Sequence, residues 1–169
     1  MIAIETRPVR DCTLTVPGSK SYTHRLLIAA ALSQGLCSID NALRSEDTDL
    51  TLGALRQMGV KIVEHGQQLE IQGCGGRFSA TDAPIDLGNS GTSMRLLIST
   101  ACLGQGEYIL TGTPRMQERP VQPLVTALDR IGVKIECLRG NGCPPVSIRG
   151  GGIRDGSTAI DCSLSSQFL

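Results

Sequence analysis

The sequence contains no tryptophan, and aromatic residues of all kinds make up only 2% of its 169 residues. It also lacks an excess of either charge, because 16 lysines and arginines balance 16 aspartates and glutamates. Grooves that bind nucleic acid combine a basic stripe with stacking aromatics, and membrane surfaces attract basic patches. We therefore expect no nucleic-acid partner and no membrane partner.

Metal-binding and membrane-crossing patterns are missing as well. The seven cysteines include no C-x-x-C pair, and His24 and His65 have no ligand-like spacing, so we expect no metal site. Such scattered cysteines are typical of reduced thiols that pack as small core residues. No apolar run is long enough to cross a membrane, and the N-terminus does not look like a signal peptide. These absences predict a cytoplasmic protein, and a hydrophobic content of 40% is enough for one domain with a sizeable core.

An internal repeat is the strongest pattern that is present. "RLLIAAALSQG" begins at Arg25, and "RLLISTACLGQG" begins about 70 residues later at Arg95. "GALRQMGVKI" (53–62) matches "TALDRIGVKI" (126–135), and each copy is followed by a short strand-like piece closed by glycine, "QLEIQG" and "PVSIRG". Because the matches keep the same order, we infer one ancestral unit present twice.

Each unit is predicted to run strand, polar loop, apolar helix, strand, second helix and two short strands. In the first unit we expect a strand at 12–17, a helix at about 21–34 that is buried on several sides and capped by Gly35, a strand at 36–42 and a second helix at about 47–58. The units would span about 12–80 and 84–150. "TAIDCSLSSQFL" resembles the start of a third unit at about 157–169, so we expect the chain to end inside a third repeat.

Polar residues occupy the same place in both units, between the first strand and the apolar helix. They are Ser19, Lys20, Ser21 and Arg25 in the first unit, and Asn89, Ser90, Gly91, Thr92 and Arg95 in the second. Free amides and the positive end of the helix dipole favour an anion at such a point, and arginine binds phosphate or carboxylate through two bonds. In a single loop the simpler interpretation is helix capping. Its recurrence favours an anion site, although the P-loop pattern is absent.

Two further arginines lie in "TPRMQERPV", ahead of the second helix of the second unit. Arg115 is predicted to form a surface ion pair with Glu118, whereas Arg119 directly precedes Pro120 and the helix start, where it could meet a ligand. His24 and His65 are expected to have structural roles.

Four stretches in order, "PGSKSYTHR", "LGNSGTSMRLL", "RMQERPV" and "SLSSQFL", resemble the 5-enolpyruvylshikimate-3-phosphate synthase family, which glyphosate targets. The resemblance covers the whole chain but less than half of a typical member. It implies an α/β (α+β) fold of repeated βαβαββ units packed around buried helices, the inside-out α/β barrel of enolpyruvyl transferases. Residues 1–169 would form most of the N-terminal of two domains, with the active site in the cleft between them.

The resemblance also implies a reaction, in which the enolpyruvyl group of phosphoenolpyruvate is transferred to the 5-hydroxyl of 3-phosphoshikimate and phosphate is released, on the route to aromatic amino acids. The 3-phosphoshikimate ligands would be Lys20, Ser21, Arg25, Ser165, Ser166 and Gln167. The phosphoenolpyruvate ligands would be Lys20, Gly91, Arg119 and Gln167, in a loop shaped by Asn89, Thr92 and Arg95.

No metal or organic cofactor is implied, and the parent enzyme would be a monomer. The acid–base groups would come from the C-terminal domain, so the catalytic residues are unknown here and the chain alone should be inactive. Two alternatives are a non-catalytic anion-binding fragment and a relative of the enolpyruvyl transferase that acts on UDP-N-acetylglucosamine. The second family has Lys-Asn where this chain has Lys20-Ser21, and a loop cysteine near 115–119, and neither feature is present.

Overall fold

The computed structural model describes residues 11, 13–153 and 156–168. The first half contains two helices and three strands: α1 (Lys20–Leu32), β1 (Gln34–Ile39), α2 (Glu46–Gln57), β2 (Lys61–His65) and β3 (Gln68–Cys74). The second half repeats this order after a short first strand: β4 (Ile85–Asp86), α3 (Gly91–Ala101), β5 (Glu107–Thr111), the 3-10 turn η1 (Met116–Glu118), α4 (Gln122–Arg130), β6 (Lys134–Cys137) and β7 (Val146–Arg149). A second 3-10 turn, η2 (Ser166–Phe168), follows.

Both halves pair their strands in the same way. The first sheet has the order β1-β3-β2, and the second has β4-β5-β7-β6, in which β4 is parallel to β5 and the other pairs are antiparallel. The last strand of each half is therefore central to its antiparallel triplet. Ile71 of β3 and Ile148 of β7 lie at its middle and are both fully buried. The repeat seen in the sequence is thus also a repeat of topology.

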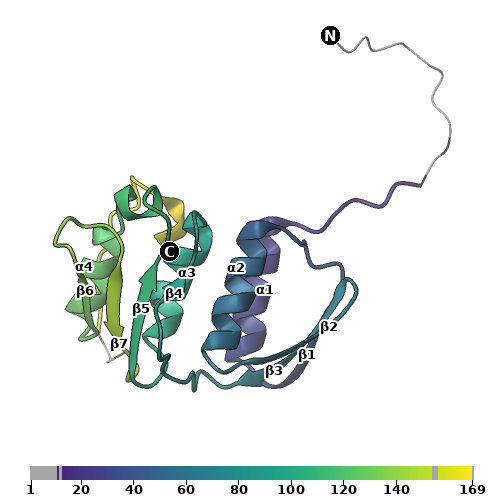
Figure 1. Cartoon of the computed structure of the whole chain (residues 1–169), viewed down its shortest axis with the longest axis horizontal. Coiled ribbons are helices and arrows are strands. Elements are labelled where there is room, and N and C mark those ends of the chain that lie inside the picture. Colours follow the sequence, from purple (N-terminus) through teal and green to yellow (C-terminus); the bar gives the residue numbers. More distant parts are fainter. Residues whose placement is uncertain (1–10, 12, 154–155, 169) are drawn as a thin grey trace, which may run out of the picture.

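The core lies between the two sheets. Figure 1 shows α1, α2 and α3 side by side, with the first sheet on one flank and the second sheet on the other. Each of these helices contributes a leucine with no exposed surface, Leu27, Leu55 and Leu97. Burial of such side chains is the main favourable term in folding. α4 packs against β6 at the outer side of the second sheet.

Serine caps the N-terminus of each of the three central helices. The side chains of Ser19, Ser45 and Ser90 accept hydrogen bonds from main-chain N–H groups in the first turns of α1, α2 and α3. Capping of this kind satisfies one of the free amides at a helix start.

A glycine at the end of each central strand brings a helix end close to the sheet. A methyl group at Gly73 would lie 2.7 Å from the Ala30 carbonyl oxygen, near the end of α1. At Gly150 it would lie 2.7 Å from the carbonyl carbon of Gly104, just beyond α3. Both distances are shorter than real contacts allow, and both neighbours are main-chain atoms. The glycines that close "QLEIQG" and "PVSIRG" therefore mark the same close approach of backbones.

The predicted strand at 12–17 is wrong for the residues that can be judged. Cys12 lies outside the described residues, and 13–17 form no strand. Leu14 and Val16 are 81% and 70% exposed. In the second half, β4 pairs with β5, but 13–17 pair with no strand in the described part of the chain.

Two predictions about α1 are also wrong. The helix ends at Leu32 with Ser33 as its C-cap, whereas Gly35 lies inside β1 with a φ of 126°. The helix is not buried on several sides, because Tyr22 and Leu26 are 71% and 46% exposed. α1 packs against β3, α2 and α3 through its other face, and nothing in the described ranges covers the exposed one. The second helix, predicted at about 47–58, forms at 46–57.

Candidate functional site

The starts of α1, α2 and α3 meet at one end of the molecule. Lys20, the first residue of α1, donates through Nζ to the Asp47 carboxylate in the first turn of α2, at 2.8 Å. The Ser93 hydroxyl, in the first turn of α3, donates to the main-chain oxygen of Asp47 at 3.1 Å. The positive ends of three helix dipoles are thus gathered in one place, which favours a bound anion.

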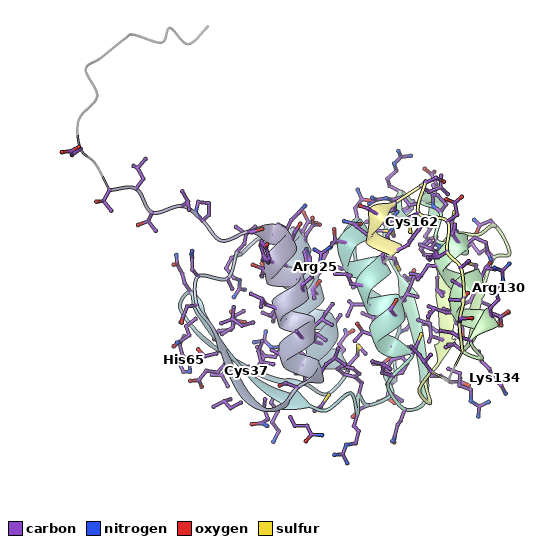
Figure 2. The ribbon with its side chains drawn as sticks, turned by 180° about the vertical axis from the view of Figure 1, so that it is seen from behind. Arg25, Cys37, His65, Arg130, Lys134 and Cys162 are labelled. Carbon is purple, nitrogen blue, oxygen red and sulfur yellow. The ribbon has the colours of Figure 1, made fainter. Side chains whose placement is uncertain are left out.

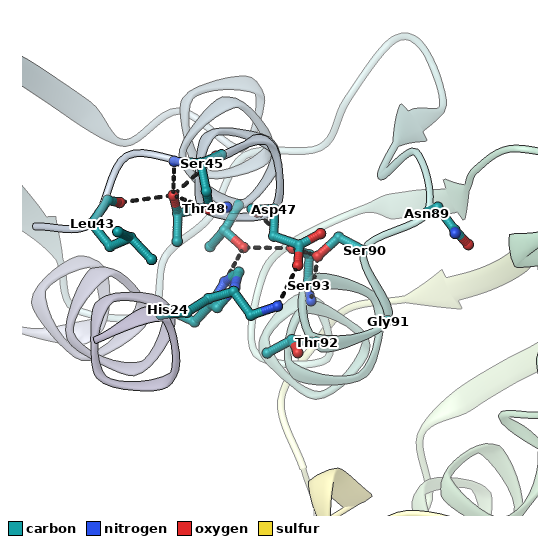
Figure 3. Close-up of polar contacts among 12 residues, drawn as sticks. His24, Leu43, Ser45, Asp47, Thr48, Asn89, Ser90, Gly91, Thr92 and Ser93 are labelled. Atoms are coloured by element: carbon teal, nitrogen blue, oxygen red, sulfur yellow. Dashed lines mark hydrogen bonds and ion pairs between the residues drawn. The ribbon is translucent and has the colours of Figure 1, made fainter. Parts of the chain in front are cut away.

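Buried hydroxyl groups connect the three helices behind this point. His24 Nδ1 lies 2.8 Å from Thr51 Oγ1, which lies 2.8 Å from Ser93 Oγ, and Ser93 Oγ lies 2.7 Å from Ser90 Oγ. Figure 3 shows His24, Asp47, Ser90 and Ser93 converging where the helices meet. His24, predicted to be structural, is fully buried.

The surroundings shift the pKa values of two groups in this cluster. A hydrogen bond from Lys20 lowers the pKa of Asp47 below its ordinary value, and the nearby Ser90 hydroxyl acts in the same direction. Burial lowers the pKa of His24, and the nearby Lys20 and Arg25 also lower it, whereas Asp47 opposes them. Asp47 is therefore charged and His24 neutral near pH 7.

A second group of polar side chains lies on the other side of the α3 start. Arg95 Nη1 donates to the Gly91 oxygen at 3.1 Å and to Gln167 Oε1 at 3.4 Å, and Gln167 Nε2 donates to Thr92 Oγ1 at 2.8 Å. The Arg95 guanidinium carbon also lies 5.4 Å from the centre of the Phe168 ring. Arg95 is only 7% exposed, and its pKa is lowered by burial and by the nearby charge of Arg119.

Arg119 approaches α3 from the end of η1. Its Nη1 donates to the main-chain oxygen of Asn89 at 3.1 Å, and a methyl group at Gly91 would lie 2.7 Å from its guanidinium carbon. None of the ion pairs among the described residues involves Arg95 or Arg119. Two guanidinium groups therefore flank one helix start without an ion-pair partner among the described residues, an arrangement that suits an anion.

Comparison with known proteins agrees with this chemistry. A family model described as EPSP synthase (3-phosphoshikimate 1-carboxyvinyltransferase) matches residues 6–169. The chain belongs to the EPSP synthase family. A protein of Vibrio atlanticus named 3-phosphoshikimate 1-carboxyvinyltransferase is 44% identical over 174 aligned residues, which cover 100% of this chain and 41% of that protein. One of the same name from Methanospirillum hungatei is 46% identical over 155, covering 92% and 36%. The chain thus spans about two fifths of the length of such EPSP synthase relatives.

A solved structure confirms the predicted fold. EPSP synthase from Acinetobacter baumannii superposes with a TM-score of 0.85 at 34% identity, over 92% of this chain and 36% of that one. The enolpyruvyl transferase fold is therefore shared, with mixed helix and sheet as predicted.

The structure brings most of the residues expected for an EPSP synthase site into two groups. Asn89, Gly91 and Arg119 are in contact, as are Thr92, Arg95 and Gln167, and Lys20 lies across the α3 start beside Asp47.

The other expected residues lie further out. Ser21 and Arg25 are exposed on α1, where Arg25 Nη1 donates to the Ser21 oxygen at 3.1 Å. Figure 2 shows Arg25 between the two halves of the molecule, away from Arg130 and Lys134. Ser165 Oγ accepts from the Gln167 amide at 3.2 Å, and Ser166 is exposed at the start of η2.

Sequence reasoning missed Asp47 and Thr51. Asp47 is one of three acidic residues in the first turn of α2, and nothing in their spacing distinguishes it from the others. Its partner Lys20 is 27 residues away, so only the tertiary structure reveals the pair. The predicted ion pair of Arg115 with Glu118 is confirmed at 2.9 Å.

Other features of the described residues fall outside this site. A groove of about 640 Å³ between α4 and residues 159–164 contains none of the predicted ligand residues. No cluster of three or more metal-ligating side chains occurs in the ranges that the structure covers. Within those ranges, no helix has the length and apolarity to cross a membrane. Burial raises the pKa of the Cys102 thiol to about 12. Two other cysteines, Cys37 and Cys162, lie in opposite halves of the molecule (Figure 2).

Acid should weaken the fold through His24. Because burial lowers the pKa of His24 in the folded state, the unfolded chain takes up a proton more readily than the folded chain below about pH 6.5. The free energy of unfolding should therefore fall as the pH drops from 7 to 5. Asp47 acts in the same direction at lower pH, since its pKa is also lowered and its stabilising effect is lost as the pH falls through that lowered pKa.

Urea unfolding at several pH values measures this effect, with His24→Asn as the control. Asparagine keeps a side-chain N–H near the position of Nδ1 but cannot take up a proton. We expect a flatter pH dependence between 7 and 5 in His24→Asn. Equal slopes in the two proteins would show that His24 titrates normally in the folded chain.

Proposed function

We propose that the chain is part of an enzyme that transfers the enolpyruvyl group of phosphoenolpyruvate to the 5-hydroxyl of 3-phosphoshikimate and releases phosphate. The observation that carries this is the pair of guanidinium groups, Arg95 and Arg119, at the start of α3 with no carboxylate partner among the described ion pairs. Both substrates carry phosphate and carboxylate groups, which such a pair binds. The names of the curated relatives support the same reaction. Residues 1–169 then form most of the N-terminal domain.

The phosphoenolpyruvate subsite lies around the α3 start. Gly91, the first residue of α3, lacks a side chain and so leaves room for the Arg119 guanidinium group. Gln167 donates to Thr92 in the same turn, and Lys20 lies beside Asp47 at the adjoining start of α2. Asn89, Thr92 and Arg95 hold the shape of this loop through the contacts described above. An anion here gains the free amides, the helix dipole and at least one charge-assisted bond from Arg119.

The 3-phosphoshikimate subsite lies beside it. Ser21 and Arg25 are exposed on α1 next to Lys20, and Ser165, Ser166 and Gln167 come from the turn that packs on α3. Serine hydroxyls donate to phosphate oxygens. The Arg25 side chain can reorient toward a ligand, because its only hydrogen bond among the described residues is to the Ser21 oxygen of its own helix. Lys20 and Gln167 are placed to contact both substrates.

The residues of this chain bind and orient the substrates, and proton transfer is left to other groups. The reaction needs proton delivery to the enolpyruvyl group and develops positive charge on its central carbon, so it requires a positioned acid and base. Those groups belong to the part of the relatives' length that this chain does not span. The chain alone is therefore inactive in turnover. We place the enzyme in the cytoplasm, which the free cysteines of the described residues support.

NMR titration of the 169-residue chain with each substrate tests the proposal, together with a phosphate-release assay. We expect amide shifts at the starts of α1 and α3 with 3-phosphoshikimate, weaker shifts with unphosphorylated shikimate, and no phosphate release. Shifts with UDP-N-acetylglucosamine instead would favour the sister family. Phosphate release by the chain alone would place the acid–base groups within these residues. The absence of shifts with any of these ligands at millimolar concentration would reject the site.

A further inference from the structure

His24 lies at the centre of the helix junction but is not among the residues expected to touch a ligand. It is fully buried on α1, and its Nδ1 lies 2.8 Å from Thr51 Oγ1 on α2. Its Nε2 is buried and has no hydrogen-bond partner in the part of the chain that the structure describes. A buried ring with one engaged and one unpartnered nitrogen indicates a specific tautomer.

The direction of the hydroxyl chain follows from counting hydrogens. The single hydroxyl hydrogen of Ser93 is donated to the main-chain oxygen of Asp47 at 3.1 Å, so Ser93 Oγ accepts from Thr51. Thr51 has then used its own hydrogen and must accept from His24 Nδ1–H. The reverse direction would leave an Nε2–H buried without an acceptor. A buried N–H without a partner is the costlier arrangement and is rare in folded proteins.

This direction determines what Ser90 does. The Ser90 hydroxyl has one hydrogen, and Ser93 Oγ lies 2.7 Å from its oxygen. Ser93 has given its own hydrogen to the main-chain oxygen of Asp47, and its oxygen has a second lone pair beside the one that accepts from Thr51, so Ser90 donates to Ser93 Oγ. Asp47 in turn holds Lys20 Nζ at 2.8 Å. The charged groups near His24 are Asp47 from α2 and Lys20 and Arg25 from α1, while α3 presents only hydroxyls.

We propose that His24 is a positioning residue whose Nδ1–H sets the direction of the chain Thr51–Ser93, which ends on the main-chain oxygen of Asp47, and so holds Asp47 and Lys20 in place for a phosphate-bearing ligand. The role in ligand binding rests on the proposed function, whereas the direction of the chain does not. His24 acts through other residues and touches no substrate itself. Its effect reaches Lys20 across three helices without any contact between His24 and the ligand.

Nitrogen and carbon NMR of the chain test the direction without any ligand. At about pH 8, above the ordinary pKa of histidine, we expect the chemical shifts of His24 to show a protonated Nδ1 and a bare Nε2. A titration of the Asp47 carboxyl carbon should give a pKa below its ordinary value in the parent chain and in His24→Asn. In His24→Leu the pKa should rise toward the ordinary value, because without the directed bond from Ser93 to its main-chain oxygen Asp47 no longer holds its carboxylate against Lys20.

A second pair of variants covers the case in which His24→Leu does not fold. Thr51→Val removes the hydroxyl without changing the volume, and Thr51→Ser keeps it. We expect Thr51→Val to weaken 3-phosphoshikimate binding about fivefold, the effect of one lost neutral hydrogen bond, and His24→Leu to do the same. Thr51→Ser and His24→Asn should bind 3-phosphoshikimate to within about twofold of the parent chain, since serine keeps the hydroxyl group and asparagine keeps the N–H donor.

Two results would overturn the assignment. One is a His24 ring protonated at Nε2, and the other is a carboxyl titration of Asp47 that is identical in the parent chain, His24→Leu and Thr51→Val. If the parent chain binds no 3-phosphoshikimate, the proposed function fails, and the direction of the hydroxyl chain is still decided by the shifts and the titration. If binding occurs but is insensitive to all four variants, the positioning role is wrong although the site is right.

Discussion

Replacing Arg119 with methionine should weaken phosphoenolpyruvate binding roughly thirtyfold, the loss expected for a charge-assisted hydrogen bond of about 2 kcal/mol. The guanidinium group stands beside Gly91 and has only the Asn89 main-chain oxygen as a partner among the described residues, so its charge is available to a ligand. For the same reason the fold depends little on it. The free energy of unfolding of Arg119→Met should stay within about 0.5 kcal/mol of the parent value. NMR titration and urea unfolding measure the two quantities.

Arg115→Met is the matched control, because Arg115 lies in the same short stretch but is exposed and paired with Glu118. Its removal changes the net charge by the same amount. We expect its binding to stay within about twofold of the parent chain, as surface ion pairs contribute little. Equal losses in both variants would mean that Arg119 acts through long-range attraction alone, and high salt should then abolish the difference from the parent. No loss in Arg119→Met would remove it from the site.

The largest effect on stability is expected at the two glycines that close the central strands. Gly73→Ala and Gly150→Ala should each lower the free energy of unfolding by about 3 kcal/mol or more, because the added methyl group overlaps main-chain atoms that cannot move independently. At Gly73 these are the carbonyl groups at the end of α1, and at Gly150 they belong to the segment after α3. If the free energy of unfolding depends on urea concentration with the same slope as in the parent chain, the change in stability arises in the folded state.

The opposite effect on stability is expected for Gly53→Ala, in the same repeat as Gly73. Gly53 lies inside α2, and a methyl group there would meet nothing within 4 Å. Alanine should therefore raise the free energy of unfolding by about 1 kcal/mol through its better helix propensity. A small loss in all three variants would contradict the packing argument. So would a gain at Gly73 or Gly150, because it would mean that the backbones can separate.

The repeat made much of the fold predictable from sequence. Matching segments gave the order of helices and strands in both halves, and glycine at the end of each central strand was already visible as a pattern. The segment 13–17 looks equally strand-like, yet Leu14 and Val16 are exposed. A strand needs a partner to receive its hydrogen bonds, and the presence of that partner is not encoded in the segment itself.

Part of the candidate site could also be proposed from the sequence. The sequence pointed to Lys20, directly before an apolar helix, to Arg95, one turn inside another, and to Arg119, ahead of a helix start, and the resemblance added Gln167. Asp47 was not found, since its importance comes from Lys20 and from Ser90, which lie 27 and 43 positions away in the sequence. Whether residues so far apart in the sequence meet depends on how α1, α2 and α3 pack. Helical periodicity fixes which face is apolar but not which polar residues of two helices meet.

The contact between Gly73 and the end of α1 has a mechanical meaning for the opposite end of that helix. α1 has 13 residues and is about 20 Å long, with Lys20 at its first position and the tight contact near its last turn. The contact acts as a pivot and the helix as a lever arm. A tilt of about 3° at the pivot would displace Lys20 by about 1 Å, and a misplacement of that size is enough to cost a large part of a reaction rate. The placement of the proposed ligand-binding end of α1 therefore depends on a contact at the opposite end of the helix.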